Sequence, residues 1–126
     1  MKIFLVEDDP LLIDIYGTKF RNAGFEVENS DNGEKAVGAI MKSDPDAIVL
    51  DLVLPHLDGW GVLSALRKQK KLDKVKIMIL SNLGQDEEIK KGYDMGANAY
   101  LVKAHNTPSQ VVEGVRKMLA GKRSSK

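Results

Sequence analysis

Short apolar runs alternate with longer amphipathic segments about five times along this chain, and this alternation limits its fold more than any other feature. The apolar runs, which are the predicted strands, lie at about residues 3–6, 25–29, 46–50, 75–80 and 99–102. The amphipathic segments, which are the predicted helices, lie at about residues 10–23, 32–42, 58–70, 86–95 and 107–119. Continuous apolar strands separated by helices are typical of a parallel sheet covered on both faces. We therefore predict an α/β fold of five βα units with right-handed crossovers.

Local signals support the ends of several of these elements. Asp9 is a suitable N-cap, Pro10 follows it in the first helical turn, and Gly24 is a suitable C-cap for the same helix. Residues 107–110 (TPSQ) have the form of a capping box with proline in the first turn. The run at 25–29 alternates polar and apolar residues, which is typical of an edge strand.

The composition fits one globular domain. With 126 residues the chain has the length of an ordinary domain, for which we predict residues 1–120 followed by a disordered tail at 121–126. The net charge of +1 provides no broad electrostatic surface for nucleic acid, so we expect no direct nucleic-acid binding. The absence of cysteine excludes disulfides and thiolate metal sites. No apolar run resembles a signal peptide or approaches the roughly 18 residues of a membrane span, so we expect a cytoplasmic protein without membrane contact.

Charged and polar residues follow four of the five predicted strands. Because the carboxyl ends of parallel strands meet at one edge of the sheet, where such folds bind ligands, these side chains should converge. They are Glu7, Asp8 and Asp9 after the first strand, Asp51 after the third, Ser81 after the fourth and Lys103 after the fifth. We expect carboxylates, a hydroxyl group and an ammonium group around one site.

This set of side chains suits a hard cation and a phosphoryl group. Several carboxylates in one pocket repel one another unless a cation lies among them. Mg²⁺ typically binds one or two carboxylates together with waters and phosphate oxygens. A carboxylate can act as a nucleophile toward phosphorus, while a metal ion and a lysine neutralise charge on the transferring group.

The order and spacing of these residues resemble the receiver domains of bacterial two-component response regulators, in particular the chemotaxis-regulator-like ones. The resemblance covers nearly the whole chain, from about residue 2 to residue 119. The motifs that carry it are Val6-Glu7-Asp8-Asp9, Asp51-Leu52-Val53-Leu54-Pro55, Asp58-Gly59, Leu80-Ser81, Gly96-Ala97 and Tyr100-Leu101-Val102-Lys103. The resemblance implies a flavodoxin-like (βα)5 fold with strand order 2-1-3-4-5, which places the first and third strands side by side.

The resemblance also implies a magnesium site around a phosphoacceptor. Asp51 would accept a phosphoryl group and contribute to Mg²⁺ binding. Asp8 would be the direct metal ligand, Glu7 would hold a metal-bound water, and the carbonyl of Val53 would be a further ligand.

A switch would follow from that chemistry, again as the resemblance implies. Lys103 would bind the phosphoryl oxygens, Ser81 would move to hydrogen-bond the phosphoryl group, and Tyr100 would swing inward. The donor would be a histidine kinase or a phosphotransfer protein. The surface of the fourth helix, fifth strand and last helix would then bind an unidentified downstream protein or output domain, or a second copy of the chain. Such a domain promotes its own phosphorylation and slow dephosphorylation but is not an enzyme in the usual sense.

Three features depart from the family pattern. Proline often follows the lysine through a cis peptide bond, but here Ala104 follows Lys103. We therefore expect either a trans bond with a rearranged loop or a strained bond. Asn82 stands where the family usually has a smaller residue, and it should crowd the phosphoryl site. Val53 and Leu83 are aliphatic and cannot orient an attacking water, which predicts slow self-dephosphorylation.

Other functions remain as alternatives. A Mg²⁺-dependent phosphohydrolase of the aspartyl-phosphate type usually has a second aspartate two residues after the nucleophile, where this chain has Val53. A flavin- or nucleotide-binding module needs a glycine-rich loop after the first strand, where this chain is acidic. A degenerate receiver would act by constitutive binding without phosphorylation. Trp60 is interpreted as a packing residue, and the basic segment at residues 67–71 as a solvated helix end.

Overall fold

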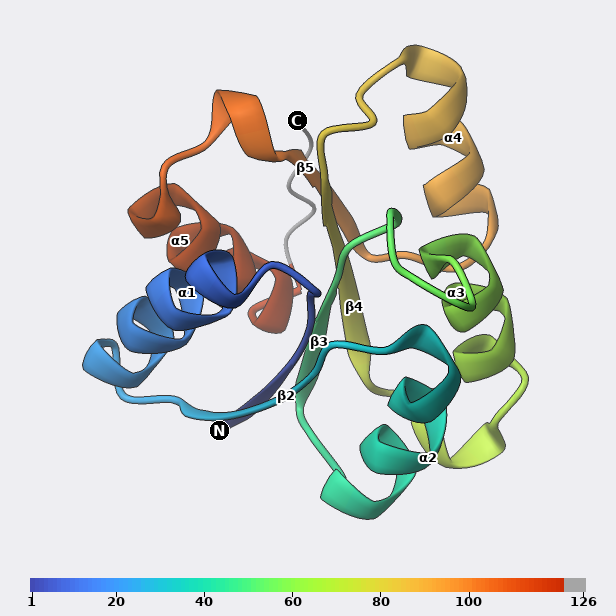
Figure 1. The fold of residues 1–126 in the computed structure, drawn as a ribbon, viewed down its shortest axis with the longest axis horizontal. Coiled ribbons are helices and arrows are strands. Elements are labelled where there is room, and N and C mark those ends of the chain that lie inside the picture. The colour runs from blue at the N-terminus through green and yellow to red at the C-terminus, as the bar shows by residue number, and fades with distance from the viewer. Residues whose placement is uncertain (122–126) are drawn as a thin grey trace.

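The computed structural model describes residues 1–121 and confirms the predicted α/β fold (Figure 1). Five parallel strands form one sheet in the order β2-β1-β3-β4-β5, as the resemblance implied. The strands are β1 (Lys2–Val6), β2 (Glu26–Ser30), β3 (Ala47–Leu50), β4 (Lys76–Ser81) and β5 (Ala99–Val102). The disordered tail expected from the sequence falls almost entirely at residues 122–126, which lie outside the described residues.

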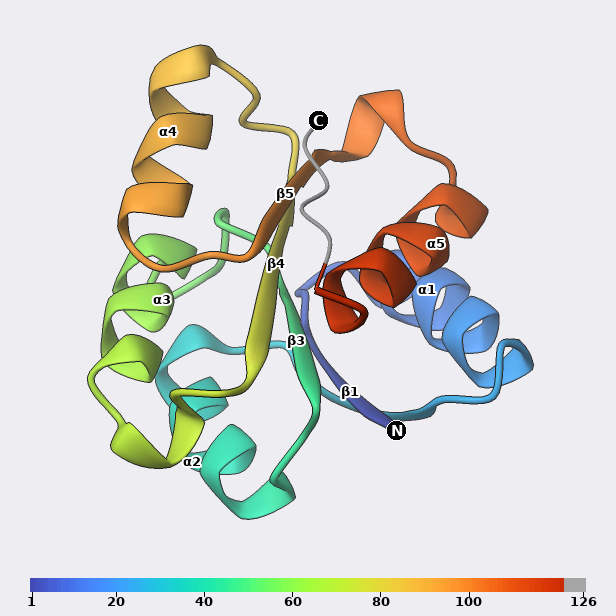
Figure 2. The same ribbon diagram turned by 180° about the vertical axis from the view of Figure 1, so that it is seen from behind.

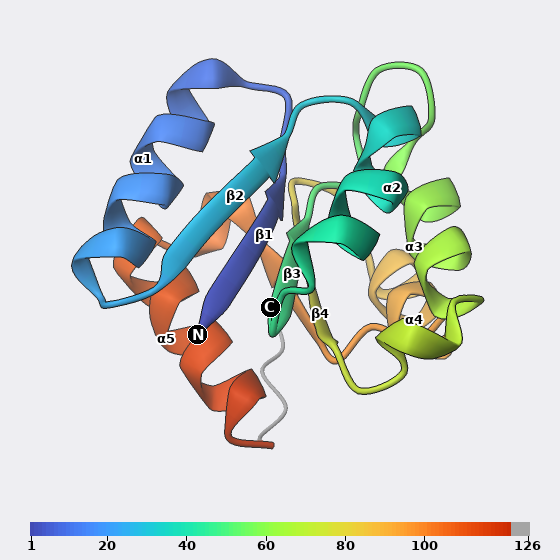
Figure 3. The ribbon, with the colours of Figure 1, turned by 90° about the horizontal axis from the view of Figure 1, so that it is seen from below.

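Helices cover both faces of this sheet, as predicted. The described α-helices are α1 (Pro10–Asn22), α2 (Gly33–Ser43), α3 (Gly59–Arg67), α4 (Asp86–Asp94) and α5 (Pro108–Leu119), with 3₁₀ turns η1 (Lys70–Leu72) and η2 (Lys103–His105). Helices α1 and α5 lie on one face, and α2, α3 and α4 lie on the other (Figures 2 and 3). Within residues 1–121, no helix combines the length and the apolar character that crossing a bilayer requires.

Alternate residues of each strand supply two separate cores. In β1, Phe4 and Val6 belong to the core shared with α2, α3 and α4, whereas Ile3 and Leu5 belong to the core shared with α1 and α5. All four side chains are at most 2% exposed. This burial on both faces explains why the central strands appear as continuous apolar runs in the sequence.

The predicted caps are present, and the element boundaries that differ most clearly from the prediction are the start of β2 and the end of α3. The Asp9 side chain caps α1, and residues 107–110 form the predicted capping box at α5. Phe25 lies before β2 rather than within it, and its ring packs edge-on against Phe20 at a centroid distance of 5.8 Å. Helix α3 ends at Arg67, about one turn earlier than predicted, and the chain continues as η1.

The guanidinium of Arg67 joins three segments at the amino-terminal end of β4 and β5. It donates hydrogen bonds to the carbonyls of Gly96 and Leu72, at 2.9 and 3.0 Å, and to the side-chain oxygen of Asn98 at 2.9 Å. The same Asn98 oxygen accepts the backbone N–H of Ile77 at 2.8 Å. The interpretation of this basic segment as a solvated helix end is therefore wrong for Arg67.

Candidate functional site

The ends of β1 and β3 bring the predicted acidic residues together. The two strands are neighbours, and the backbone N–H of Asp51 donates to the carbonyl of Val6 at 3.0 Å. Carboxylate oxygens of Glu7, Asp8 and Asp51 all lie within 4.8 Å of one another. Glu7 and Asp51 are buried, whereas Asp8 is exposed. The carboxylate of Asp9 serves as the N-cap of α1 instead, as predicted.

Lys103, which follows β5, completes this acidic pocket. Its ammonium nitrogen lies 2.6 Å from Oε1 of Glu7 and 2.7 Å from Oδ2 of Asp51. The side chains of Lys103, Glu7 and Asp51 are 11%, 2% and 7% exposed, so water screens these contacts little. Interactions between charges are much stronger in such a place than at the surface. One ammonium group thus partly compensates two buried carboxylates.

Both carboxylate oxygens of Glu7 have hydrogen-bond partners. Oε1 accepts from Lys103, and Oε2 accepts the backbone N–H groups of Asp8 and Asp9 at 3.0 and 3.1 Å. Burial raises the pKa of Glu7 above its ordinary value, although the hydrogen bond from Lys103 acts against this. Burial by itself would lower the pKa of Lys103, but its hydrogen bonds to Asp51 and Glu7 outweigh that effect and the pKa is raised. Lys103 is therefore charged at neutral pH.

Asp51 and Asp8 are the carboxylates best placed to meet an incoming ligand. Oδ2 of Asp51 contacts Lys103, and Oδ1 accepts the backbone N–H of Val53 at 3.1 Å. The Val53 side chain is 60% exposed, so the segment after Asp51 borders solvent. The backbone N–H of Val53 thus contacts Asp51, and the role of its carbonyl as a metal ligand stays a prediction.

The oxygen atoms of this pocket are a donor set that fits Mg²⁺. In octahedral Mg²⁺ sites the metal–oxygen bonds of about 2.0–2.1 Å place ligand oxygens about 3–4 Å apart. The observed separations of up to 4.8 Å among the three carboxylates need only small side-chain shifts to reach that range. The group contains neither histidine nor cysteine, which favours a hard cation over zinc.

Ser81 and Tyr100 lie beside the pocket and meet at Leu83. The Ser81 hydroxyl oxygen accepts the backbone N–H of Leu83 at 3.3 Å, and the Tyr100 hydroxyl donates to the Leu83 carbonyl. Both side chains are fully buried. Burial, followed by the charges of Glu88 and Asp51, raises the pKa of Tyr100 to about 12, so its hydroxyl remains a donor at neutral pH. The Tyr100 ring is buried and lies close to Gly92 of α4, and its movement on phosphorylation stays a prediction.

A tightly packed loop connects Asp51 to α3. The backbone N–H of Gly59 donates to the carbonyl of Leu52 at 2.8 Å, and a Cβ at Gly59 would lie 2.3 Å from the carbonyl oxygen of Asp51. A Cβ at Gly33 would lie 1.9 Å from the carbonyl oxygen of Leu57. Sequence reasoning identified Gly59 only as part of a motif and missed Gly33. Glycine is required at these two positions because segments distant in sequence approach one another there in the folded chain.

The structure describes the positions of two residues that depart from the family pattern, Ala104 and Asn82. All described peptide bonds are trans. For the Lys103–Ala104 bond, this confirms the expected trans bond and excludes the strained cis alternative. Residues 103–105 form η2, and the backbone N–H of Asn106 donates to the Lys103 carbonyl at 3.4 Å. Asn82 is exposed beside Ser81, and its crowding of a phosphoryl group stays a prediction.

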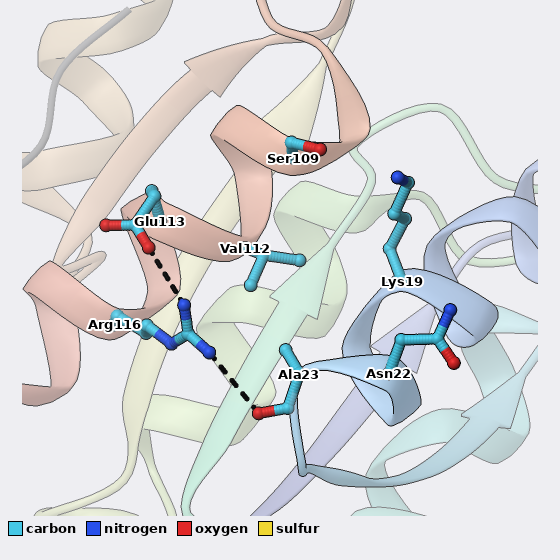
Figure 4. Close-up of a pocket in the computed structure, with 7 residues that line it drawn as sticks. All are labelled: Lys19, Asn22, Ala23, Ser109, Val112, Glu113 and Arg116. Carbon is cyan, nitrogen blue, oxygen red and sulfur yellow. Dashed lines mark hydrogen bonds and ion pairs between the residues drawn. The ribbon is translucent and has the colours of Figure 1, made fainter.

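A separate hollow of about 290 Å³ lies between α1 and α5 (Figure 4). Arg116 crosses it, paired with Glu113 at 2.9 Å and donating to the carbonyl of Ala23 at 3.3 Å. Val112 lies between the two helices, and Lys19 extends along the rim. The lining contains none of the residues of the acidic pocket, and its charged groups are exposed.

Comparisons with known proteins agree on one family. The family model described as "Response regulator receiver domain" matches residues 3–116. The DNA-binding dual master transcriptional regulator RpaA of Synechocystis is 31% identical over 94% of this chain. That match includes 48% of the regulator, so the chain spans about half the length of this curated relative.

Solved structures give the same result. The BeF3-activated N-terminal receiver domain of Klebsiella pneumoniae RstA is 28% identical with a TM-score of 0.86, covering 94% of this chain and 98% of that one. The receiver domain of the Francisella response regulator 1452 is 28% identical with a TM-score of 0.87, covering 95% and 97%.

Proposed function

This chain belongs to the family of response-regulator receiver domains, and we propose that it is a signalling switch in which Asp51 accepts a phosphoryl group in the presence of Mg²⁺. The observation that carries the proposal is the double contact of Lys103 with Glu7 and Asp51, beside the exposed carboxylate of Asp8. A buried cationic side chain and several carboxylates in one pocket suit phosphoryl transfer better than they suit a structural role.

The residues of the pocket would divide the chemistry as follows. A carboxylate oxygen of Asp51 would attack phosphorus while the bond to the donor's nitrogen or oxygen breaks, and the donor would leave with its electron pair. Lys103 would turn from Asp51 toward the phosphoryl oxygens. Asp8 and Asp51, with the carbonyl of Val53 and a water held by Glu7, would bind Mg²⁺, which supplies charge neutralisation when bound.

Ser81 and Tyr100 would relay the change to the α4–β5–α5 surface. Their shared contact with Leu83 supports this, because a movement of the Ser81 hydroxyl toward a phosphoryl group removes one of the bonds that hold Leu83. The surface would then bind a downstream protein, an output domain or a second copy of the chain. We propose a histidine kinase or a phosphotransfer protein as the donor and the cytoplasm as the location. We propose no direct contact with nucleic acid or membrane.

The test is intact-mass analysis after incubation with acetyl phosphate and Mg²⁺. We expect the parent chain to gain one phosphoryl group and the Asp51→Asn variant to gain none, because an amide is a poor nucleophile toward phosphorus. Omission of Mg²⁺ should reduce the gain strongly. An unmodified parent chain would instead support a degenerate receiver that acts by constitutive binding. Continuous turnover of a generic phosphate ester would support a phosphohydrolase.

The phosphoryl group on Asp51 should persist for minutes or longer. As in the family pattern, Val53 and Leu83 would flank the phosphoryl group, and their aliphatic side chains cannot orient an attacking water. Val53→Glu should shorten the lifetime by about tenfold or more, since a well-placed general base contributes about 10²–10⁴-fold. The measurement is loss of the added mass with time after removal of acetyl phosphate.

Leu11→Glu is a suitable control for this substitution. Leu11 is also an exposed aliphatic residue, at 65% exposure against 60% for Val53, but it lies on α1. It should leave the lifetime unchanged. A parent lifetime of only seconds would contradict the prediction.

A further inference from the structure

Trp60 and Lys91 form a contact between α3 and α4. The ammonium nitrogen of Lys91 lies 4.4 Å from the centroid of the Trp60 ring, within the range of a cation–π interaction. Trp60 is the second residue of α3, and Lys91 lies in the last turn of α4. The two helices are neighbours on the same face of the sheet (Figures 1 and 2). Sequence reasoning assigned Trp60 to packing and did not connect it with α4.

The first turn of α3 is also fixed directly to the segment of Asp51. Gly59, which precedes Trp60, donates its N–H to the Leu52 carbonyl at 2.8 Å. A Cβ at Gly59 would lie 2.3 Å from the carbonyl oxygen of Asp51 and 2.4 Å from Cα of Leu52. Backbone atoms packed this closely cannot move independently, so a shift of Asp51 is passed to the first turn of α3.

Helix α4 buries little of its own surface. Of its nine residues only Ile89 and Gly92 are buried. The exposed Lys90 pairs with Asp94 at 2.6 Å within the same helix and therefore does not fix α4 to its neighbours. A helix with few buried apolar contacts can shift at small cost. The cation–π interaction of Lys91 with Trp60 is thus one of the contacts that connect α4 to α3, beside the packing of Ile89 and Tyr93 into the core.

We propose that the Trp60–Lys91 contact is a second route by which the state of Asp51 reaches α4, beside the one through Ser81 and Tyr100. The inference rests on the proposed function, since it concerns regulation by the same phosphoacceptor. Tyr100 is inward here, with its ring close to Gly92 of α4. The proposed function places Tyr100 inward in the phosphorylated state, and on that basis we assign the contact to the arrangement of α4 that favours a phosphoryl group on Asp51. Because coupling between two sites is reciprocal, losing the contact weakens binding at Asp51.

The experiment uses beryllofluoride with saturating Mg²⁺ as the probe, since a solved relative carries this group in its activated form. Its affinity is measured by Trp60 fluorescence, and hydrogen exchange at residues 86–94 is measured by mass spectrometry. Lys91→Gln should weaken beryllofluoride binding about two- to fivefold, the size of an exposed cation–π interaction, and should speed exchange in α4. Lys91→Arg should keep both properties. Lys90→Gln makes the same charge change one residue away and should leave the beryllofluoride affinity unchanged, although loss of its pair with Asp94 can itself speed exchange in α4.

Each contrary result has a distinct meaning. If the parent chain binds beryllofluoride and Lys91→Gln binds it equally well or more tightly, the second route is refuted while the proposed function stands. An equal weakening by Lys90→Gln would also refute it, since the effect would then come from helix charge and not from the contact with Trp60. If the parent chain itself does not bind beryllofluoride, the proposed function fails and the inference fails with it.

Discussion

Replacement of Lys103 by methionine should destabilise the fold by about 3–5 kcal/mol at neutral pH, the range typical of removing one partner of a buried ion pair. The ammonium group contacts Glu7 and Asp51 at 2.6 and 2.7 Å, and all three side chains are nearly buried. Without it, two carboxylates remain close together with little solvent around them. The measurement is urea unfolding followed by circular dichroism.

The loss of stability in Lys103→Met should depend on pH, and the pKa shift of Glu7 determines the direction of this dependence. In the parent chain the pKa of Glu7 is raised by burial and lowered by Lys103, with a net increase from 4.5. Without Lys103 the folded-state pKa of Glu7 rises further. A carboxyl group with a raised folded-state pKa stabilises the fold below its unfolded pKa, and this contribution is lost as pH rises through the folded pKa. The stability difference between parent and variant should therefore shrink as pH falls toward about 4.5.

Lys90→Met is the matched control for this substitution. Lys90 also pairs with a carboxylate, but both side chains of that pair are more than 60% exposed. Exposed pairs contribute little, so the control should stay within about 0.5 kcal/mol of the parent chain at every pH. A Lys103→Met variant as stable as this control would mean that the acidic pocket does not depend on its ammonium group.

Gly59→Ala should destabilise the fold by about 2–4 kcal/mol and reduce phosphoryl uptake on Asp51. The added methyl group would lie 2.3 Å from the carbonyl oxygen of Asp51 and 2.4 Å from Cα of Leu52, and neither backbone atom can rotate away. Helix α3 would have to move outward and lose the hydrogen bond from Gly59 to Leu52. Urea unfolding and intact-mass analysis with acetyl phosphate measure the two effects.

Gly38→Ala provides a control of opposite sign. A Cβ at Gly38, an exposed position within α2, would meet no atom within 4 Å. Alanine is a better helix former than glycine, so this variant should be about 0.5–1 kcal/mol more stable than the parent chain. If Gly59→Ala and Gly38→Ala had the same stability, the close approach of α3 to Asp51 would not contribute to the stability of the fold.

The strands, helices and their order were predictable because their signals are local or belong to the family. Hydrophobic periodicity located the strands, and Asp9 and residues 107–110 marked the helix starts that the structure contains. The hydrogen bonds of Arg67 at the end of α3 were not predictable, because their acceptors in Gly96 and Asn98 are distant in sequence. A run of basic residues in the sequence does not show which of them forms hydrogen bonds inside the fold and which remains in solvent.

The acidic pocket was predictable as a set of residues but not as a set of contacts. The positions after the strands placed Glu7, Asp51 and Lys103 at one edge of the sheet, where the structure has them. That both oxygens of Glu7 are already bonded depends on how the chain turns into α1, which strand-end reasoning does not determine. The contact of Lys91 with Trp60 depends on helix packing and left no sequence signal.

The hydrogen bonds of Arg67 make the two ends of the sheet mechanically unequal. At the end opposite the acidic pocket, one guanidinium ties together the segments that lead into β4 and β5. Near the pocket, the turn after β4 is bonded by Ser81 and Tyr100 through a single residue, Leu83. We therefore expect rearrangements of β4 and β5 to occur mainly near the acidic pocket, because fewer of these bonds hold the chain there. We also expect substitutions of Leu83 to alter the turn after β4, while the segments joined by Arg67 keep their positions.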